Sequence, residues 1–316
     1  MANYLKATSE NWIGRTSGDQ LYLHEKIELL TPEQTPAGRH FSILGYACDE
    51  GVRRNQGRVG AANGPNSIRK MLGKMPNHLS ESQKVYDFGD IQCDDGNMEA
   101  CQELLSKTIG SLLDKGTFPI VLGGGHDVAY GHYNGIKQHL LSSNKLPSIG
   151  IINFDAHFDL RDDSFGSNSG TPFYQIANEN EPFHYLCLGI RKDANDKKLF
   201  ETAASLDVTY VMQNTFRIEF MNEIKTWIKA FLKKVNHVYV TIDMDGFSSA
   251  YAPGSSAASP MGFAPDIVLE CLDTIISSEK LISVDIAEMN PVYDSDHQTA
   301  KLAASLVHHI IHRIMP

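Results

Sequence analysis

The sequence has little of what marks secreted, membrane-spanning or disulfide-stapled proteins. Its 316 residues include five cysteines, an odd number, widely spaced and without a Cys-x-x-Cys pair. This pattern argues against a disulfide framework or a thiolate zinc site and favours buried, reduced thiols. No apolar run approaches the ~18 to 20 residues of a membrane helix, and the polar N-terminus has no signal-peptide core. We therefore expect a cytoplasmic protein without a membrane partner.

Positive charge is also scarce. The chain has 28 lysines and arginines against 38 aspartates and glutamates, which gives a net charge of −10 and a pI of about 5.7. Such an acidic chain repels phosphate backbones, so we expect no nucleic-acid partner. Hydrophobic residues make up 42% and charged residues 21%, which is typical of globular proteins and excludes intrinsic disorder as the main description.

Short apolar runs alternate with amphipathic stretches along the chain. Eight runs are predicted strands: Phe41–Gly45, Val85–Phe88, Phe118–Leu122, Ser148–Phe154, Tyr185–Gly189, Val208–Met212, His237–Ile242 and Leu281–Ile286. Five stretches are predicted helices: Met98–Asp114, Val128–Leu140, Ile218–Val235, Pro265–Ser277 and Ala300–Ile314. This alternation predicts a three-layer α/β/α fold with a mostly parallel, eight-stranded sheet.

The chain shows no linker and no internal repeat that would divide it. We expect one domain over residues 1–316, with residues 1–40 as an N-terminal extension packed on it. One long irregular stretch, Gly246–Gly262, is rich in small residues. It has two interpretations, a flexible loop or a functional one, and a loop of this length inside a compact fold favours function.

Three of the predicted strands are followed at once by side chains that bind metal ions. The sequence gives His126 after the third strand, Asp155, His157 and Asp159 after the fourth, and Asp243 and Asp245 after the seventh. In a parallel sheet, ligands bind at the carboxyl ends of the strands, where these residues can converge. In D-x-H-x-D and D-x-D, an extended backbone points alternate side chains the same way.

These six side chains supply four carboxylates and two imidazoles, which is enough for two metal ions. A single Gly-Gly-Gly-His or Asp-x-Asp is weak evidence, because each also occurs in ordinary turns. Four carboxylates at neighbouring strand ends would repel one another without a cation, so the set together favours a metal site. Oxygen ligands with some imidazole and no thiolate suit Mn²⁺, and two such ions about 3.5–4 Å apart activate water for hydrolysis.

With these motifs the sequence resembles the arginase/ureohydrolase family. GGGHD at 123–127, DAHFD at 155–159 and DMDGF at 243–247 match the family's three metal-binding motifs in order, and APGSSAASPMG at 252–262 and AEMNP at 287–291 match further blocks. The resemblance implies an arginase-like catalytic domain, two Mn²⁺ ions on the six ligands above, a homo-oligomer, and hydrolysis of a guanidine or amidine C–N bond. It also implies that Glu288 pairs with the cationic group of the substrate.

Other positions distinguish branches of this family. Arg161 stands where arginases carry Asn, Phe173 where they carry His, and Ser169 where agmatinases usually carry His. Together with EGVRRNQGRVGAANGPNSIR at 50–69, they resemble the branch that hydrolyses N-formimino-L-glutamate to L-glutamate and formamide in histidine degradation. Such a substrate is an anionic amidine, so a guanidinium is expected to clamp a carboxylate. The candidate substrate-binding residues are Arg161, Ser169, Thr171 and Arg191.

Several assignments keep alternatives at this stage. Asp159 is the candidate proton shuttle to the leaving nitrogen, besides its role as a ligand, and Glu288 is the second candidate catalytic residue. For Arg53, Arg54 and Arg58, substrate binding and a solvated surface cluster are equally good interpretations. For Ser169 and Thr171, turn hydrogen bonds compete with substrate contact. Agmatine or another guanidino acid is the alternative substrate, and an inactive binding module is the alternative to an enzyme.

Overall fold

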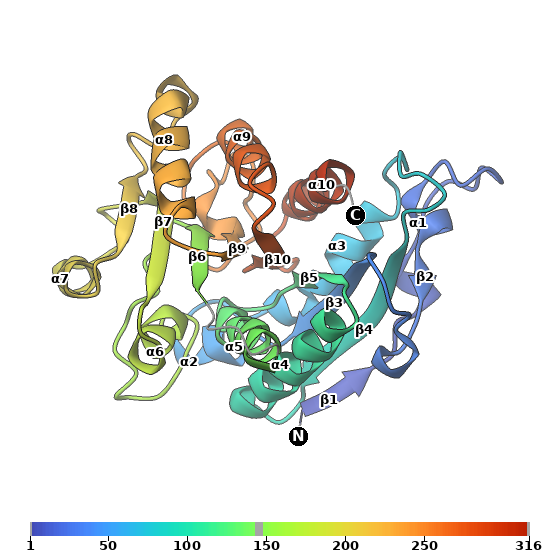
Figure 1. Cartoon of the computed structure of the whole chain (residues 1–316), viewed down its shortest axis with the longest axis horizontal. Helices are drawn as coiled ribbons and strands as arrows, with labels where there is room; N and C mark the ends of the chain where they lie inside the picture. Colours follow the sequence, from blue (N-terminus) through green and yellow to red (C-terminus); the bar gives the residue numbers. More distant parts are fainter. Residues whose placement is uncertain (1, 143–147, 315–316) are drawn as a thin grey trace.

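A ten-stranded sheet runs through the middle of the molecule in the computed structural model, which describes residues 2–142 and 148–314 (Figure 1). The strand order is β1-β4-β3-β5-β10-β9-β6-β7-β8, and β2 also pairs with β4. All pairs are parallel except β1 with β4. The strands are β1 Ala2–Leu5, β2 Glu28–Leu29, β3 Phe41–Ala47, β4 Val85–Cys93, β5 Phe118–Leu122, β6 Ile149–Phe154, β7 His184–Ile190, β8 Thr209–Met212, β9 His237–Asp243 and β10 Leu281–Ala287.

The prediction of a mostly parallel α/β sheet is confirmed, and the eight predicted strands are β3 to β10. The predicted number of strands was wrong, because β1 and β2 add to the edge at β4. Neither contains an apolar run: β1 alternates between half-buried and exposed residues, and β2 is two residues long. Such short edge strands are specified by their pairing partner more than by their own sequence.

Helices cover both faces of the sheet. One face packs against α3 (Gly64–Leu72), α8 (Met221–Leu232), α9 (Pro265–Ile276) and α10 (Gln298–Arg313); the other packs against α4 (Met98–Asp114), α5 (Val128–Ser142), α6 (Pro172–Glu179) and α7 (Lys197–Ser205). Two further helices are short, α1 (Leu23–Lys26) and α2 (Glu50–Arg54), and Leu23 of α1 belongs to the core cluster of the first face. The core divides accordingly: Ile152 and Phe154 of β6 belong to the first cluster, and Ile151 belongs to the second. This is the alternation expected of a strand buried on both faces.

Asp87 of β4 joins both helix α3 and the N-terminal segment to the sheet. Arg69 of α3 is 1% exposed and contacts Asp87 of β4 at 2.9 Å and Asp90 at 2.5 Å. Trp12 donates its indole N–H to the same Asp87 at 2.7 Å. The first 40 residues therefore reach the core through β4, although the division of the chain into domains stays a prediction. Within residues 2–142 and 148–314, no helix is long and apolar enough to cross a membrane.

Candidate metal centre

The six predicted metal ligands meet at the carboxyl edge of four adjacent strands, β5, β10, β9 and β6. They form two groups whose ligand atoms lie within 4.8 Å of one another, and Asp155 belongs to both. The first group is His126, Asp155, Asp159 and Asp243, and the second is Asp155, His157 and Asp245. A carboxylate common to two groups is the arrangement that holds two ions close together.

The backbone brings these side chains together in a different way from the one expected. The prediction of an extended D-x-H-x-D segment was wrong, because β6 ends at Phe154 and the chain leaves the sheet. Asn195 forms hydrogen bonds with backbone groups of this segment, which lies outside the sheet. Its Oδ1 accepts from the Phe158 N–H at 3.0 Å, and its Nδ2 donates to the Ala156 carbonyl at 2.8 Å. Similarly, Asp243 ends β9 while Asp245 lies in the 3-10 turn Met244–Gly246. Polar partners fix these bends, and apolar periodicity cannot indicate them.

Asp159 and Glu288 have a backbone conformation that side chains rarely adopt. Their φ angles are 48° and 62°, in the left-handed region that costs energy outside glycine and persists where surrounding contacts enforce it. Glu288 follows β10 directly, and its Oε1 accepts from the backbone N–H of His126 at 2.9 Å. Its other carboxylate oxygen, Oε2, is buried without a hydrogen-bond partner among the described residues. That oxygen is free to bind a cationic group.

The donor atoms converge as metal ligands do. Nδ1 of His126 lies 3.2 Å from Asp155, 2.9 Å from Asp159 and 3.0 Å from Asp243, yet none of these contacts has hydrogen-bond geometry in the described structure. Nδ1 of His157 lies 3.5 Å from Asp155 and 3.3 Å from Asp245. Lone pairs from several residues therefore point at shared positions, which a cation would satisfy.

The charge of the cluster demands a cation too. Burial alone would lower the pKa of His126, but Asp155, Asp159 and Asp243 raise it well above its usual value. Burial and the neighbouring carboxylates raise the pKa of Asp243 and of Glu288. Without a positive charge the four aspartates repel one another in a low-dielectric site. The donor set and its charge fit divalent ions that prefer oxygen and imidazole.

A buried hydrogen-bond network holds the other side of His126. Its Nε2 lies 2.9 Å from Oγ1 of Thr241, which donates to Asp285 at 2.5 Å. Asp285 also accepts from the hydroxyl of Tyr239 and contacts Nδ1 of His132 at 2.7 Å. All these groups are buried, so the network is fully formed by side chains of β9, β10 and α5. Partners of this kind orient metal-binding imidazoles.

A cavity of about 270 Å³ opens beside the ligand cluster, lined by His157, Asp159, Asp243, Asp245 and Glu288 together with residues from other segments of the chain. Arg161 and Ser169 also line it, and Asn55 joins them: it accepts from Arg161 Nη1 at 2.6 Å and donates to Ser169 Oγ at 3.1 Å. Ser256 and Ala257 of the long loop form part of the wall. A guanidinium and metal-binding groups therefore face the same small space.

Two predicted substrate contacts lie elsewhere. Thr171 is the N-cap residue of α6, and its hydroxyl oxygen lies 3.0 Å from the Asn168 carbonyl and 2.9 Å from Oε1 of Gln175. The guanidinium of Arg191 makes two contacts with Asp193, at 3.1 and 2.7 Å. Neither residue lines the cavity as described. Local polar partners hold both side chains in this structure, and their contact with the substrate stays a prediction.

The arginine-rich segment divides by position. Arg53 pairs with Glu50, and Arg54 bridges Glu50 and Glu99. Arg58 lines the cavity, where it donates to the carbonyls of Ser255 and Ser256 and stacks on Tyr293 at 4.0 Å. These contacts give all three arginines structural partners.

Sequence reasoning missed Asn55, Asn195 and Thr241. Asn55 lies in the VRRNQG segment, where the arginines drew attention, and Thr241 precedes Asp243 in a strand that reads as apolar. The carboxyl of Asp127 is fully buried, which raises its pKa to about 7, and it accepts from the Tyr46 hydroxyl at 2.7 Å. Phe173 packs edge-on against His126 at 5.3 Å, so an apolar ring covers the imidazole on that side.

These ligands at the carboxyl edge of a three-layer α/β/α sheet define an arginase-type metallohydrolase site, and the chain belongs to the arginase family, whose sequence model matches residues 39–312. It is 44% identical over 307 residues to a formimidoylglutamase of Aeromonas salmonicida, covering 95% of this chain and 96% of that protein. It is 40% identical over 328 residues to a formimidoylglutamase of Clostridium tetani, covering 99% and 96%.

Solved structures show the same fold. The formimidoylglutamase of Bacillus subtilis superposes with a TM-score of 0.83 at 23% identity, covering 95% of this chain and 94% of that one. The Trypanosoma cruzi formiminoglutamase with Mn²⁺ superposes with a TM-score of 0.80 at 21% identity, covering 94% and 100%. The prediction of an arginase-like fold is confirmed.

Proposed function

We propose that this protein hydrolyses N-formimino-L-glutamate to L-glutamate and formamide. The observation that carries the proposal is the cavity in which Arg161 faces two metal-ligand groups that share Asp155. An anionic amidine needs both features, a guanidinium for a carboxylate and a hydrolytic metal site for the C–N bond. Relatives at 40–44% identity over nearly the whole chain are formimidoylglutamases, which supports the same substrate.

We further propose that the two ligand groups hold two Mn²⁺ ions. His126, Asp155, Asp159 and Asp243 would hold one, and Asp155, His157 and Asp245 the other. The all-oxygen-and-imidazole donor set suits Mn²⁺, and a structure with a similar fold contains it. When bound, such a pair supplies Lewis acidity that polarises the amidine and makes water nucleophilic at neutral pH.

The protein groups around the ions have separate tasks. Glu288 presents its unpartnered Oε2 to the amidinium of the substrate, because a buried cation needs an anion opposite it. Arg161, held by Asn55 at 2.6 Å, binds a substrate carboxylate, and the Ser169 hydroxyl at the cavity wall donates a hydrogen bond. Asp159, which lines the cavity beside the ligand cluster, passes a proton to the leaving nitrogen of glutamate.

The test is a turnover assay on the Mn-loaded protein with formiminoglutamate, agmatine and arginine offered in parallel. We expect formamide and glutamate from formiminoglutamate and no urea from the other two. Urea from agmatine or arginine alone would refute the proposed role of Arg161 and establish a guanidino substrate. Two bound metals without turnover of any of the three would refute the proposed substrate.

Two properties of the whole protein belong to the same proposal. The acidic charge and the five free cysteines support a cytoplasmic location. Membership of the arginase family supports a homo-oligomer, which light scattering of the purified protein tests directly. A monomeric mass in that experiment would refute the oligomer and leave the proposed reaction intact.

A further inference from the structure

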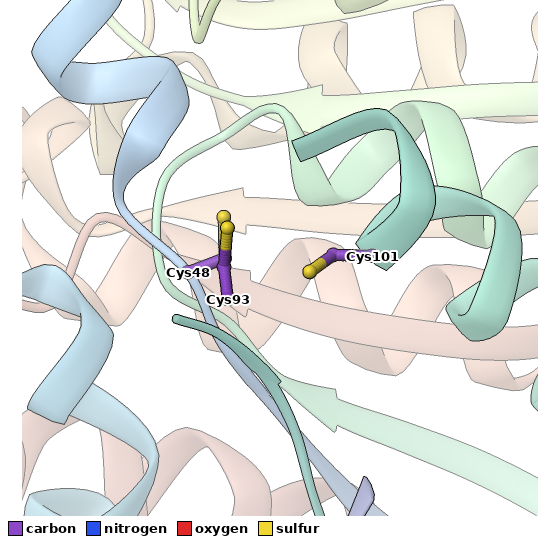
Figure 2. A group of neighbouring side chains, drawn as sticks. All are labelled: Cys48, Cys93 and Cys101. Carbon is purple, nitrogen blue, oxygen red and sulfur yellow. The ribbon is translucent and has the colours of Figure 1, made fainter. Parts of the chain in front are cut away.

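Three of the five cysteines gather in one place away from the metal ligands described above. Cys48 follows β3, Cys93 ends β4, and Cys101 lies in the second turn of α4. Figure 2 shows the Cys48 and Cys93 side chains next to each other and the Cys101 side chain pointing toward them from α4. Their sulfur atoms all lie within 4.8 Å of one another. Their spacing in the sequence gives no sign of this cluster, because the pairing of β3 with β4 and the position of α4 create it.

The separation of the three sulfurs is close to what one metal ion requires. A zinc–sulfur bond is about 2.3 Å, so thiolates around one ion lie about 3.8–4 Å apart. Cys48 and Cys101 are buried, and Cys93 is half-buried. Small changes in side-chain torsion would therefore bring the three sulfurs to bonding distance, and Cys93 provides the access from solvent.

The surroundings of the cluster allow thiolate to form when a cation arrives. Cys101 lies near the N-terminus of α4, whose backbone dipole favours negative charge. The Cys101 thiol and burial raise the pKa of Cys48, and burial raises the pKa of Cys93 to about 11, while the backbone N–H groups of Glu50 and Gly96 oppose these shifts. The thiols of Cys48 and Cys93 are thus protonated when no ion is present, and a cation must displace these protons to bind.

We propose that Cys48, Cys93 and Cys101 form a binding site for one soft, thiolate-preferring cation of the Zn²⁺ and Cd²⁺ class. All three donor atoms are sulfur, whereas both groups of the arginase-type centre contain only oxygen and nitrogen. Ligand softness separates these donor sets, so Mn²⁺ and a soft cation select different sites on the same chain. This proposal does not depend on the substrate of the enzyme.

The thiol site contacts the catalytic metal-binding turn through the backbone. The carbonyl of Cys48 accepts from the N–H of Gly125 at 2.9 Å, and Gly125 immediately precedes His126. Gly124 also packs closely against Cys48, since a Cβ at position 124 would lie 1.8 Å from the backbone carbonyl oxygen of Cys48. A cation that crosslinks Cys48 to β4 and α4 therefore fixes the strand end against which this turn packs.

The experiment is a Cd²⁺ titration of the Mn-loaded, fully reduced protein. Thiolate bound to cadmium gives an ultraviolet charge-transfer absorption that carboxylate and imidazole ligands do not give. We expect this absorption to saturate at one Cd²⁺ per chain, with up to three protons released per ion, and the thermal midpoint to rise. Absence of the absorption at one equivalent, or loss of Mn²⁺ without it, would overturn the proposal.

Matched variants assign the absorption to the cluster. Cys93→Ser, which alters the half-buried member at the end of β4, should weaken Cd²⁺ binding at least tenfold. Cys271→Ala removes a buried thiol of α9, outside the cluster, and should leave the titration unchanged. Circular dichroism of the cation-free variants shows whether each is folded. Unchanged Cd²⁺ binding in folded Cys93→Ser would contradict the site, as would its loss in folded Cys271→Ala.

Discussion

The hydroxyl of Thr241 accepts a hydrogen bond from the imidazole of His126, and this contact determines which ring nitrogen faces the metal site. Thr241 has one hydroxyl proton, and it donates that proton to Asp285 at 2.5 Å. Its oxygen, 2.9 Å from Nε2 of His126, therefore accepts an N–H. In the neutral imidazole, which is the form that binds a metal ion, Nδ1 then carries the lone pair. Nδ1 is the atom that faces Asp155, Asp159 and Asp243.

Thr241→Val should weaken metal binding at the His126 group while the protein remains folded. Valine has nearly the same shape but no hydroxyl, so the tautomer of His126 is no longer fixed. Loss of such a partner typically lowers metal affinity by about 10- to 100-fold, and a Mn²⁺ titration followed by electron paramagnetic resonance measures this. Thr241→Ser keeps the hydroxyl and should restore most of the affinity. Equal affinities for Val and Ser would show that the hydroxyl has no such role.

Asp155→Asn and Asp245→Asn should differ in how many ions they lose. Asp155 belongs to both ligand groups and Asp245 to one, so the first substitution should leave fewer than one Mn²⁺ per chain and the second about one. Activity should fall by orders of magnitude in both variants, because each substitution disrupts the site for two metal ions. Metal analysis after Mn²⁺ loading and gel filtration measures the stoichiometry. The same stoichiometry in the two variants would contradict the shared position of Asp155.

Arg161→Gln should raise KM for formiminoglutamate with a smaller effect on kcat. A hydrogen bond to a charged group contributes about 1.5–3 kcal/mol, which corresponds to a rise of about 10- to 100-fold. Steady-state kinetics of the Mn-loaded variant provide the measurement. Arg53→Gln is the control, because Arg53 pairs with Glu50 and does not line the described cavity. If Arg161→Gln keeps its KM, Arg161 does not bind the substrate.

Arg69→Leu should destabilise the fold by about 3–5 kcal/mol, because it leaves the buried carboxylate of Asp87 without its partner. Chemical denaturation of the variant and the parent chain measures the difference in the free energy of unfolding. Arg313→Leu breaks an exposed pair with Asp273 and should have a much smaller effect. Comparable losses in the two variants would mean that burial does not determine the contribution of the Arg69 pair.

Two histidines of α10 should lower the free energy of unfolding as the pH drops through about 6.5. Burial lowers the pKa of His308 and of His312 on α10, and neighbouring histidines, including His78, add to the shift. The unfolded chain, with histidine pKa values of about 6.5, therefore binds more protons than the folded chain in this range, and stability rises with pH. Urea denaturation at about pH 7.5 and pH 5.5 should show a smaller pH dependence in His308→Gln/His312→Gln. An equal dependence would exclude these two residues as its source.

Periodicity predicted the central sheet because strands such as β6 and β9 are buried on both faces and therefore consist largely of apolar residues. β5 was predicted with its observed bounds, Phe118–Leu122, as was the helix Met98–Asp114. β1 and β2 were not predicted, because neither has a buried apolar run. Half of the residues of β1 are exposed, and β2 is only two residues long. Pairing with a distant partner such as β4 leaves no mark on the local sequence.

The sequence by itself determined the chemistry of the centre: four carboxylates and two imidazoles after three apolar strands need a cation, wherever the chain places them. The tertiary structure alone decided that Asp155 serves both ligand groups, that Arg161 meets Asn55, and that Arg191 turns to Asp193. It also brought Cys48, Cys93 and Cys101 within 4.8 Å. Ligand type is a property of each side chain, whereas its partners depend on which strands and loops pack together. Those contacts join residues that lie far apart in the chain.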